Sequence, residues 1–314
     1  MKASKYLGIF IFGLAQLAAV AQPRLNPDRD PNDHSILELG NSHSMLKQSV
    51  DHQLSTAFVN TSGAHLTYYG GPVIHSVIVY KVLYGAGTYQ TFITTTGNSS
   101  MAGFFSTVTN STYMDWLTEY NTSSPTQTIA RGSYGGSYTI TPASSRNGST
   151  ITDTQIQAEL SAQMGAGHLP APSNNTLYMV FFPKGKKITQ NGSASCVAGG
   201  FCAYHGTFLR NAQNVYYGVM PDASPGTGCA SGCGGSATPF NNQTSVASHE
   251  MIEAVTDAAV GLATVFGPPL AWYDVNNGEI GDICNAQQGT VTVGTVTYTV
   301  QKEWSNKKGA CVVK

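Results

Sequence analysis

The chain has 314 residues, of which 41% are hydrophobic and 11% are charged, and its formal net charge at pH 7 is -1. This hydrophobic fraction is enough to bury a sizeable core. Nucleic acids and anionic membranes both demand a basic face, so the weak charge argues against either as a partner. Beyond the first residues, no segment reaches the roughly 18 uninterrupted apolar residues that a membrane helix needs.

The first 21 residues follow the pattern of a secretory signal peptide. Lys2 and Lys5 supply a positive start, and an apolar run without charges extends over 7–20. Ala19-Val20-Ala21 is then a small-x-small cleavage site. We therefore expect residues 1–21 to be removed and the mature protein to be secreted and extracellular, with an association with the cell wall as one option.

Residues 22–62 differ in composition from the rest. Pro23, Pro27 and Pro31 lie among charged residues, and no apolar periodicity follows. This is typical of a loosely ordered N-terminal extension. Its removal as a pro-segment stays open, although it contains no dibasic processing site.

The remaining residues, 63–314, alternate between strand and helix patterns. Strands are expected over 72–84, 177–182, 201–207 and 215–220, and a hairpin over 290–302 is expected to turn at Gly294. Helical spacing predicts one helix or two short ones over 99–120, a helix over 153–164 capped by Thr152 or Asp153, and a helix over 244–260 capped by Thr244 or Ser245. The pattern predicts a single α+β domain, a mixed β-sheet with two or three helices.

Cysteines and glycosylation motifs agree with export. All six cysteines lie between positions 196 and 311, and clustering in an exported chain favours disulfides over free thiols. Proximity in the sequence suggests the pairs Cys196–Cys202, Cys229–Cys233 and Cys284–Cys311 among fifteen connectivities. Eight Asn-x-Ser/Thr acceptors for N-glycosylation are present: Asn60, Asn98, Asn110, Asn121, Asn147, Asn174, Asn191 and Asn242.

The strongest chemical motif is His-Glu-Met-Ile-Glu at 249–253. On a helix, His249 and Glu253 lie on one face, one turn apart. That is the spacing by which the zincin motif H-E-x-x-H offers two ligands to one zinc, with Glu253 in the place of the second histidine. A carboxylate oxygen is an acceptable zinc ligand. Glu250 would take a proton from the water that the metal acidifies.

A third ligand is expected from the segment Asn277-Gly278-Glu279-Ile280-Gly281-Asp282. It resembles the gluzincin arrangement, in which a downstream glutamate binds zinc and a nearby aspartate holds the first histidine. By that analogy Glu279 is the third ligand, and Asp282 fixes the tautomer of His249 or ligates in its place. Asp257, two turns beyond His249, is an alternative ligand or orienting carboxylate.

Other interpretations of these residues stay open. A histidine on an amphipathic helix is often only a packed residue. In 274–279, oxygen-bearing side chains at alternate positions before a glycine also suggest a calcium loop. His205, inside a predicted strand, is expected to be a buried strand histidine rather than a further residue of the metal site.

Several segments resemble the plant phosphate-induced, or EXORDIUM-like, family. These are Tyr-Tyr-Gly-Gly-Pro-Val at 68–73 with the strand that follows, Phe-Cys-Ala-Tyr-His-Gly at 201–206, Gly-Cys at 228–229 through Cys233, and Glu-Ala-Val-Thr-Asp at 253–257. The similarity spans about residues 65–290 in consistent order. It implies a secreted, wall-associated protein linked to growth, without an established catalytic activity. The H-E-x-x-E helix looks more like that of microbial relatives, and the order of elements matches the zincin layout, in which the active-site helix follows the sheet.

Two functions remain at this point. The first is a secreted zinc-dependent metallohydrolase, a peptidase, in which His249, Glu253 and Glu279 bind zinc and Glu250 is the base. The second is a non-catalytic extracellular or cell-wall protein of the EXORDIUM-like type with a structural calcium or no metal. A peptide or a cell-wall or matrix component is the expected substrate, and the chain is expected to act as a monomer.

Overall fold

The computed structural model describes residues 42–46, 61, 63–198, 200–230 and 232–314. The expected signal peptide over 1–21, most of the expected extension over 22–62 and the acceptor Asn60 lie outside the described residues. Five residues of that extension, Ser42–Leu46, form strand β1, so the expectation of loose order does not extend to them.

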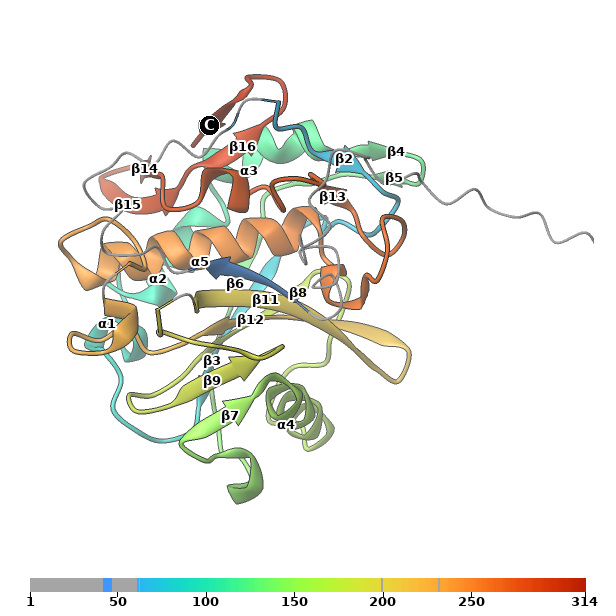
Figure 1. The fold of residues 1–314 in the computed structure, drawn as a ribbon. Coiled ribbons are helices and arrows are strands. Elements are labelled where there is room, and N and C mark those ends of the chain that lie inside the picture. The colour runs from blue at the N-terminus through green and yellow to red at the C-terminus, as the bar shows by residue number, and fades with distance from the viewer. Residues whose placement is uncertain (1–41, 47–60, 62, 199, 231) are drawn as a thin grey trace, which may run out of the picture. The chain divides into compact units, whose positions relative to one another are not determined.

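The centre of the fold is a six-stranded sheet in the order β1-β11-β12-β8-β3-β6 (Figure 1). After β1, its strands along this order are β11 (Phe201–Arg210), β12 (Gln213–Met220), β8 (Thr176–Phe181), β3 (Ile78–Tyr84) and β6 (Ser133–Ile140). The pairs β12–β8, β8–β3 and β3–β6 are parallel, whereas β1–β11 and β11–β12 are antiparallel. The α+β class and the mixed sheet are therefore confirmed.

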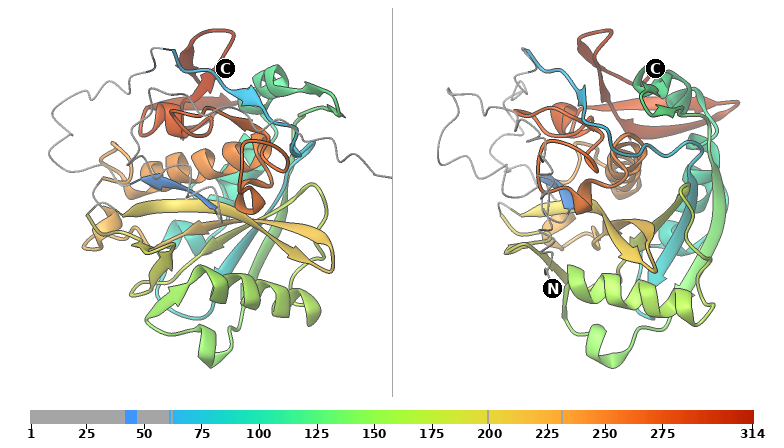
Figure 2. Two further views of the ribbon diagram at one scale, coloured as in Figure 1. Left: turned by 45° about the vertical axis from the view of Figure 1, so that its right-hand side comes forward. Right: turned by 90° about the vertical axis from the view of Figure 1, so that its right-hand side faces the viewer.

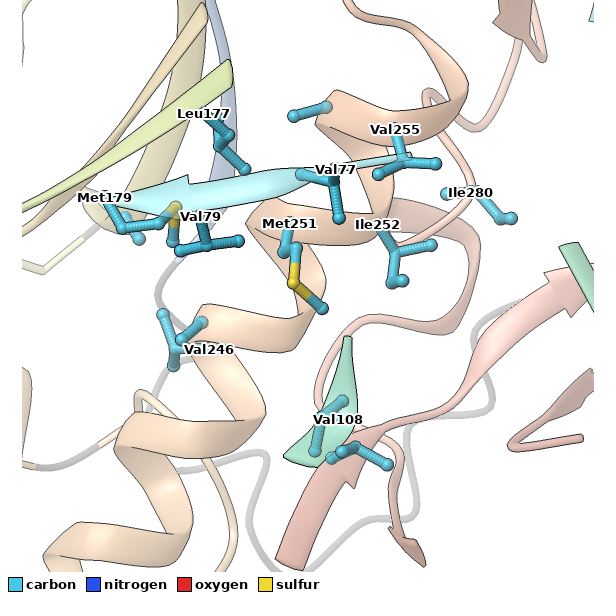
Figure 3. Packing of buried hydrophobic residues seen from close by; sticks show 14 of the residues in the cluster. Val77, Val79, Val108, Leu177, Met179, Val246, Met251, Ile252, Val255 and Ile280 are labelled. Atoms are coloured by element: carbon cyan, nitrogen blue, oxygen red, sulfur yellow. The ribbon is translucent and has the colours of Figure 1, made fainter. Parts of the chain in front are cut away.

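Helices cover both faces of this sheet (Figure 2). Helix α5 (Pro239–Thr256) packs on one face, and α4 (Asp153–Gly165) belongs to the hydrophobic cluster of the other. Successive strand residues point to opposite faces, so Val79 joins the cluster on the α5 side and Val82 joins the cluster on the α4 side. Figure 3 shows Val77, Val79, Leu177 and Met179 facing Val246, Met251 and Val255 of α5.

The remaining elements are short. The helices are α1 (Thr91–Thr94), α2 (Met101–Val108) and α3 (Thr112–Asp115), with 3-10 turns η3 (Trp116–Tyr120), η4 (Ser144–Arg146), η5 (Gly228–Ala230), η6 (Val260–Leu262) and η7 (Asp282–Cys284). The strands are β2 (Thr67–Tyr68), β4 (Thr122–Ser123), β5 (Thr126–Gln127), β7 (Thr150–Thr152), β9 (Lys187–Gln190), β10 (Ser193–Ala194), β13 (Trp272–Tyr273), β14 (Gln288–Val293), β15 (Val296–Gln301), β16 (Glu303–Ser305) and β17 (Ala310–Val312).

One expected strand is shorter than the sequence indicates, and one expected helical segment is divided. The segment 72–77 is not part of β3, because Ile74 N–H donates to Val255 O and Pro72 O accepts from Ala258 N, which ties it to the end of α5. The helical pattern over 99–120 is divided into α2, α3 and η3, because Ser100 and Ser111 each accept a backbone N–H and begin new helices. Two short helices were one of the two expectations here.

Helix α5 begins and ends earlier than the expected 244–260. Pro239 occupies its first turn, where the missing N–H costs nothing, and Thr238 is the extended residue before it. The helix ends at Thr256, because Asp257 leaves the helical conformation. The helix expected over 153–164 ends one residue later, at Gly165, and its cap is Thr152, one of the two expected residues. The hairpin β14–β15 around Gly294 is confirmed.

The three disulfides join Cys196 to Cys229, Cys202 to Cys233 and Cys284 to Cys311. Only the third expected pair is confirmed, and the pairs Cys196–Cys202 and Cys229–Cys233 are wrong. The first two bonds tie the segment at the start of β11 to the loop after β12, and this depends on how the two strands pair. The bonds are compatible with an extracellular protein.

Five expected glycosylation sites are exposed, namely Asn98, Asn110, Asn121, Asn174 and Asn191. Asn147 and Asn242 are half-buried. The amide of Asn242 also bonds Ser236 through both of its ends, which makes it a poor acceptor. Among the described residues, no helix combines the length and the apolar character that crossing a bilayer requires.

Candidate metal centre

Helix α5 carries the first part of the candidate site. His249 and Glu253 lie one turn apart, and His249 Nε2 is 3.2 Å from Glu253 Oε2. Both side chains and that of Glu250 are fully buried. The expectation that the i, i+4 pair shares one face of the helix is therefore confirmed.

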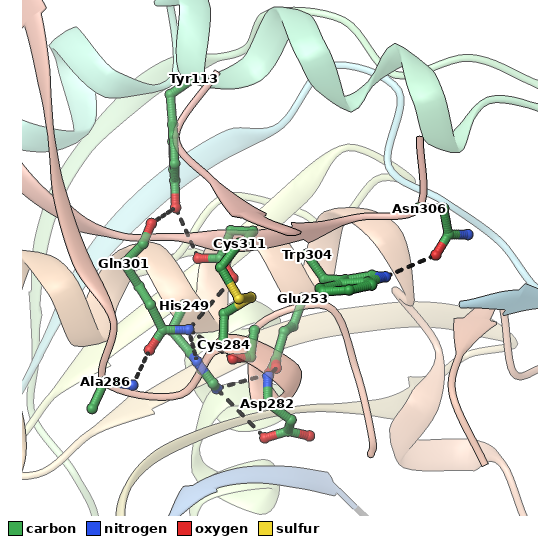
Figure 4. Close-up of a disulfide and its surroundings, with 12 residues drawn as sticks. Tyr113, His249, Glu253, Asp282, Cys284, Ala286, Gln301, Trp304, Asn306 and Cys311 are labelled. Atoms are coloured by element: carbon green, nitrogen blue, oxygen red, sulfur yellow. Dashed lines mark hydrogen bonds and ion pairs between the residues drawn. A yellow bond between two sulfur atoms is a disulfide. The ribbon is translucent and has the colours of Figure 1, made fainter. Parts of the chain in front are cut away.

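The loop before η7 brings a second carboxylate to this pair, as Figure 4 shows. Asp282 Oδ1 lies 3.9 Å from His249 Nε2, and the Asp282 N–H donates to Glu253 Oε1 at 3.0 Å. The side chain of Asp282 is 15% exposed, whereas His249 and Glu253 are 0% exposed. The three donor atoms of His249, Glu253 and Asp282 lie within 4.8 Å of one another, and these residues are called the His249 group below.

Glu279 takes a different position from the one expected. Its Oε1 lies 3.5 Å from His205 Nε2, and its N–H donates to Asp282 Oδ2 at 3.1 Å. The geometry thus favours Asp282, rather than Glu279, as the third donor beside His249. The turn over 279–282 directs Glu279 towards His205 and Asp282 towards His249, and Asp282 as a ligand was one of the expectations.

His205 is the member of the cluster that sequence reasoning did not include. It lies on β11, is 1% exposed, and its Nδ1 is 3.4 Å from Glu250 Oε2 and 3.5 Å from Glu253 Oε2. The expectation of a buried strand histidine is confirmed, but the ring is also part of the site. We call His205, Glu250 and Glu253 the His205 group, whose donor atoms likewise lie within 4.8 Å of one another. The sequence did contain a signal that could have placed His205 in the site. Side chains alternate between the two faces along β11, so residue 205 points to the same face as Ala203, towards α5.

The buried charges shift one another's proton affinities. Burial lowers the pKa of His249, but Glu253, Glu250 and Asp282 outweigh it and raise the pKa to about 10. Burial alone would raise the pKa of Glu253, yet His249 and His205 bring it below its usual value. Glu250 keeps a pKa raised to about 7, mainly by burial, although His205 opposes this.

Several polar atoms of the cluster have no hydrogen-bond partner within the described part of the chain. They include His249 Nε2 and Glu253 Oε2, which face each other as an ion pair at 3.2 Å, and Glu250 Oε1. All three side chains are fully buried. Buried polar atoms in native proteins are nearly always bonded, and an exception calls for a missing water or ion. Nitrogen and carboxylate donors in this number suit a divalent transition metal.

An outer layer of hydrogen bonds fixes the ring of His249 (Figure 4). The Gln301 amide lies 2.7 Å from His249 Nδ1 and donates to Gly281 O at 2.8 Å. Beyond it, Glu303 accepts from the Tyr113 hydroxyl at 2.8 Å, and burial raises the pKa of Glu303 to about 8. The nitrogen end of Gln301 faces the ring because its Oε1 accepts the Ala286 N–H, and these contacts hold His249 in one orientation.

Two other acidic candidates have local structural contacts. Asp257 Oδ1 accepts the Ala271 N–H at 2.8 Å where α5 ends. Asp274 Oδ1 accepts the N–H groups of Asn276 and Asn277, and its Oδ2 accepts the His65 N–H. The geometry therefore disfavours Asp257 as a ligand and the segment 274–279 as a calcium loop, because calcium needs oxygens that are not engaged by such donors.

Gly281 permits the close approach of the loop to α5, and its replacement by alanine is expected to weaken cation binding by about 10–100-fold. A Cβ at this position would lie 2.6 Å from His249 Nδ1 and 2.8 Å from Glu253 Oε1. The measurement is a zinc titration of the metal-free protein. Gly267→Ala is the matched control, since its Cβ would meet nothing within 4 Å. Equal affinities for the two variants would contradict the placement of the loop.

Comparison with known proteins adds no assignment. No protein-family model, no curated protein and no solved structure matches this chain. The assignment of the site therefore rests on its own geometry.

Proposed function

We propose that this protein is a secreted, metal-dependent hydrolase of the zincin type that cleaves peptide bonds. Zinc would be held by His249 Nε2, Glu253 Oε2 and Asp282 Oδ1. The observation that carries the proposal is the convergence of these three donors within 4.8 Å, two of them from one face of a helix and one from the loop that follows. Three protein ligands leave a zinc ion one open position, which is the mark of a catalytic rather than a structural site.

Bound zinc brings the pKa of a water molecule near neutrality. The residue that would take the proton is Glu250, which neighbours His249 and faces the same cluster. In the metal-free cluster, burial raises the pKa of the Glu250 carboxyl to about 7. The ring of His205, 3.4 Å from Glu250 Oε2, would hold the carboxylate in place.

Access would come from the side of Asp282. It is the one member of the His249 group with an exposed fraction above zero, so water and substrate would approach along the 279–282 loop. The disulfide Cys284–Cys311 attaches this loop to β17, which keeps the third ligand in position outside the cell, where thiols become oxidised.

A second function is supported by the burial itself. His249, Glu250, Glu253 and Glu279 are 0% exposed, and closed sites often hold a metal that only stabilises the fold. A protein with such a closed site would correspond to the non-catalytic extracellular protein that the EXORDIUM-like resemblance implies. Calcium fits such a site less well than zinc, because two histidines face the cluster and calcium takes oxygen ligands.

Metal analysis together with a peptide-library assay tests the proposal. The secreted chain should contain at least one equivalent of zinc, cleave peptides, lose cleavage with a chelator and regain it with added zinc. Zinc without any cleavage would support the stabilising site instead. A protein that neither contains zinc nor binds it after chelator removal would overturn the hydrolase and the stabilising zinc site, and would leave the non-catalytic protein with calcium or no metal.

A further inference from the structure

The two donor groups of the cluster have one residue in common. Glu253 Oε2 lies 3.2 Å from His249 Nε2 and 3.5 Å from His205 Nδ1. Each histidine also has a carboxylate of its own, Asp282 beside His249 and Glu250 beside His205. The cluster therefore contains two sets of three donors, and each set meets within 4.8 Å.

We propose that this cluster binds two divalent cations, one in the His249 group and one in the His205 group, with Glu253 shared between them. The first cation is the one on which the proposed function rests, and the second is an additional site. Paired metal ions at about 3.5–4 Å commonly share a carboxylate in this way.

Charge supports the second cation. Four carboxylates meet two imidazoles here, three of them fully buried (Glu250, Glu253 and Glu279) and one, Asp282, 15% exposed. One divalent cation balances only half of the four negative charges, and a buried charge without compensation is costly. A second cation in the His205 group would balance the rest without requiring either histidine to carry a proton.

Buried carboxylate oxygens also face the second site. Glu250 Oε2 and Glu253 Oε2 lie 3.4 Å and 3.5 Å from His205 Nδ1, and both side chains are fully buried. The other oxygen of Glu250, Oε1, has no hydrogen-bond partner within the described ranges. An interior carboxylate oxygen without a donor is costly. One imidazole nitrogen and two carboxylate oxygens form a donor set that zinc and manganese accept.

The shared residues make the two cations interact. Their positive charges repel each other at short range, so the second cation should bind more weakly than the first. The second cation would also bind Glu250, the residue proposed as the base for the first. Hydrolysis should therefore rise with the first equivalent of metal and fall as the second site fills.

Equilibrium dialysis of the metal-free full chain against zinc, with metal counted by mass spectrometry, tests this directly. The wild type should saturate at about two equivalents. Glu250→Gln and Asp282→Asn, which each change one group, should saturate at about one, and Glu253→Gln should bind almost none. Glu159→Gln is the matched control, since it changes a buried carboxyl of α4 that pairs with Arg146 and contacts neither group, and it should keep about two.

Circular dichroism melts establish that each variant folds, and His205→Gln and His249→Gln replace any variant that does not. Saturation of the wild type at one equivalent with chelator-sensitive cleavage would overturn the second site and leave the proposed hydrolase standing. Unchanged stoichiometry in Glu250→Gln and His205→Gln would also overturn the second site. Absence of binding in the wild type would overturn the two proposals together.

Discussion

Glu250→Gln is expected to lower peptide hydrolysis at least about 100-fold, the usual scale for the loss of a general base, while the cation of the His249 group stays bound. Glutamine keeps the size of the side chain but cannot take a proton. The three donors beside it, His249 Nε2, Glu253 Oε2 and Asp282 Oδ1, are unchanged. The measurement pairs cleavage rate with zinc content in the same preparation.

His249→Ala is the contrasting variant. It removes a donor of the His249 group, so the catalytic cation and hydrolysis should be lost together. Its melting temperature should lose the part that the cation of the His249 group contributes, because a ligand stabilises only the state that it binds. Equal cleavage by Glu250→Gln and wild type would show that the carboxylate beside His249 is not the base.

Removal of the metal is expected to destabilise the protein more at pH 9 than at pH 6. Zinc needs a neutral His249 nitrogen, and the pKa of His249 without metal is raised to about 10. Protons therefore compete with zinc throughout this range, and binding tightens as the pH rises. At a hundredfold excess over the dissociation constant, the bound cation would add about 2.7 kcal/mol to the free energy of unfolding.

The metal-free protein itself should become less stable as the pH rises. Below about pH 6.5, which is the pKa of His249 in the unfolded chain, its raised pKa in the folded protein stabilises the fold fully. This stabilisation is lost as the pH rises towards about 10. Glu250 and Glu303, with pKa values of about 7 and 8, likewise lose their contribution as the pH rises above about 4.5. Glu253, whose pKa is lowered, loses its contribution only in acid.

Thermal melts with and without chelator between pH 6 and pH 9 measure both trends. The gap between the two melting curves should widen with pH. Glu303→Gln is a useful control, because it removes one of the raised carboxyl pKa values but no donor of either group. An equal effect of the chelator at pH 6 and pH 9 would contradict proton competition at His249.

The candidate metal site shows how far local sequence patterns reach. His249, Glu250 and Glu253 were identified because helical periodicity relates residues within one or two turns. Which histidine each of Glu279 and Asp282 faces could not be predicted in this way. Their positions depend on a turn in which Gly281 passes close to the His249 ring, and only the packing of the loop on α5 creates that approach.

The sequence by itself determined the α+β composition, the helix at 153–165 with its Thr152 cap, the hairpin around Gly294 and the shared face of His249 and Glu253. Each of these depends on neighbours within a few positions along the chain. Only the tertiary structure decided that His205 joins the cluster and that Cys196 pairs with Cys229 and Cys202 with Cys233. The physical reason is that these contacts join β11 to α5 and to the loop after β12, and pairing between distant segments is set by the burial of the whole core, which no local pattern encodes.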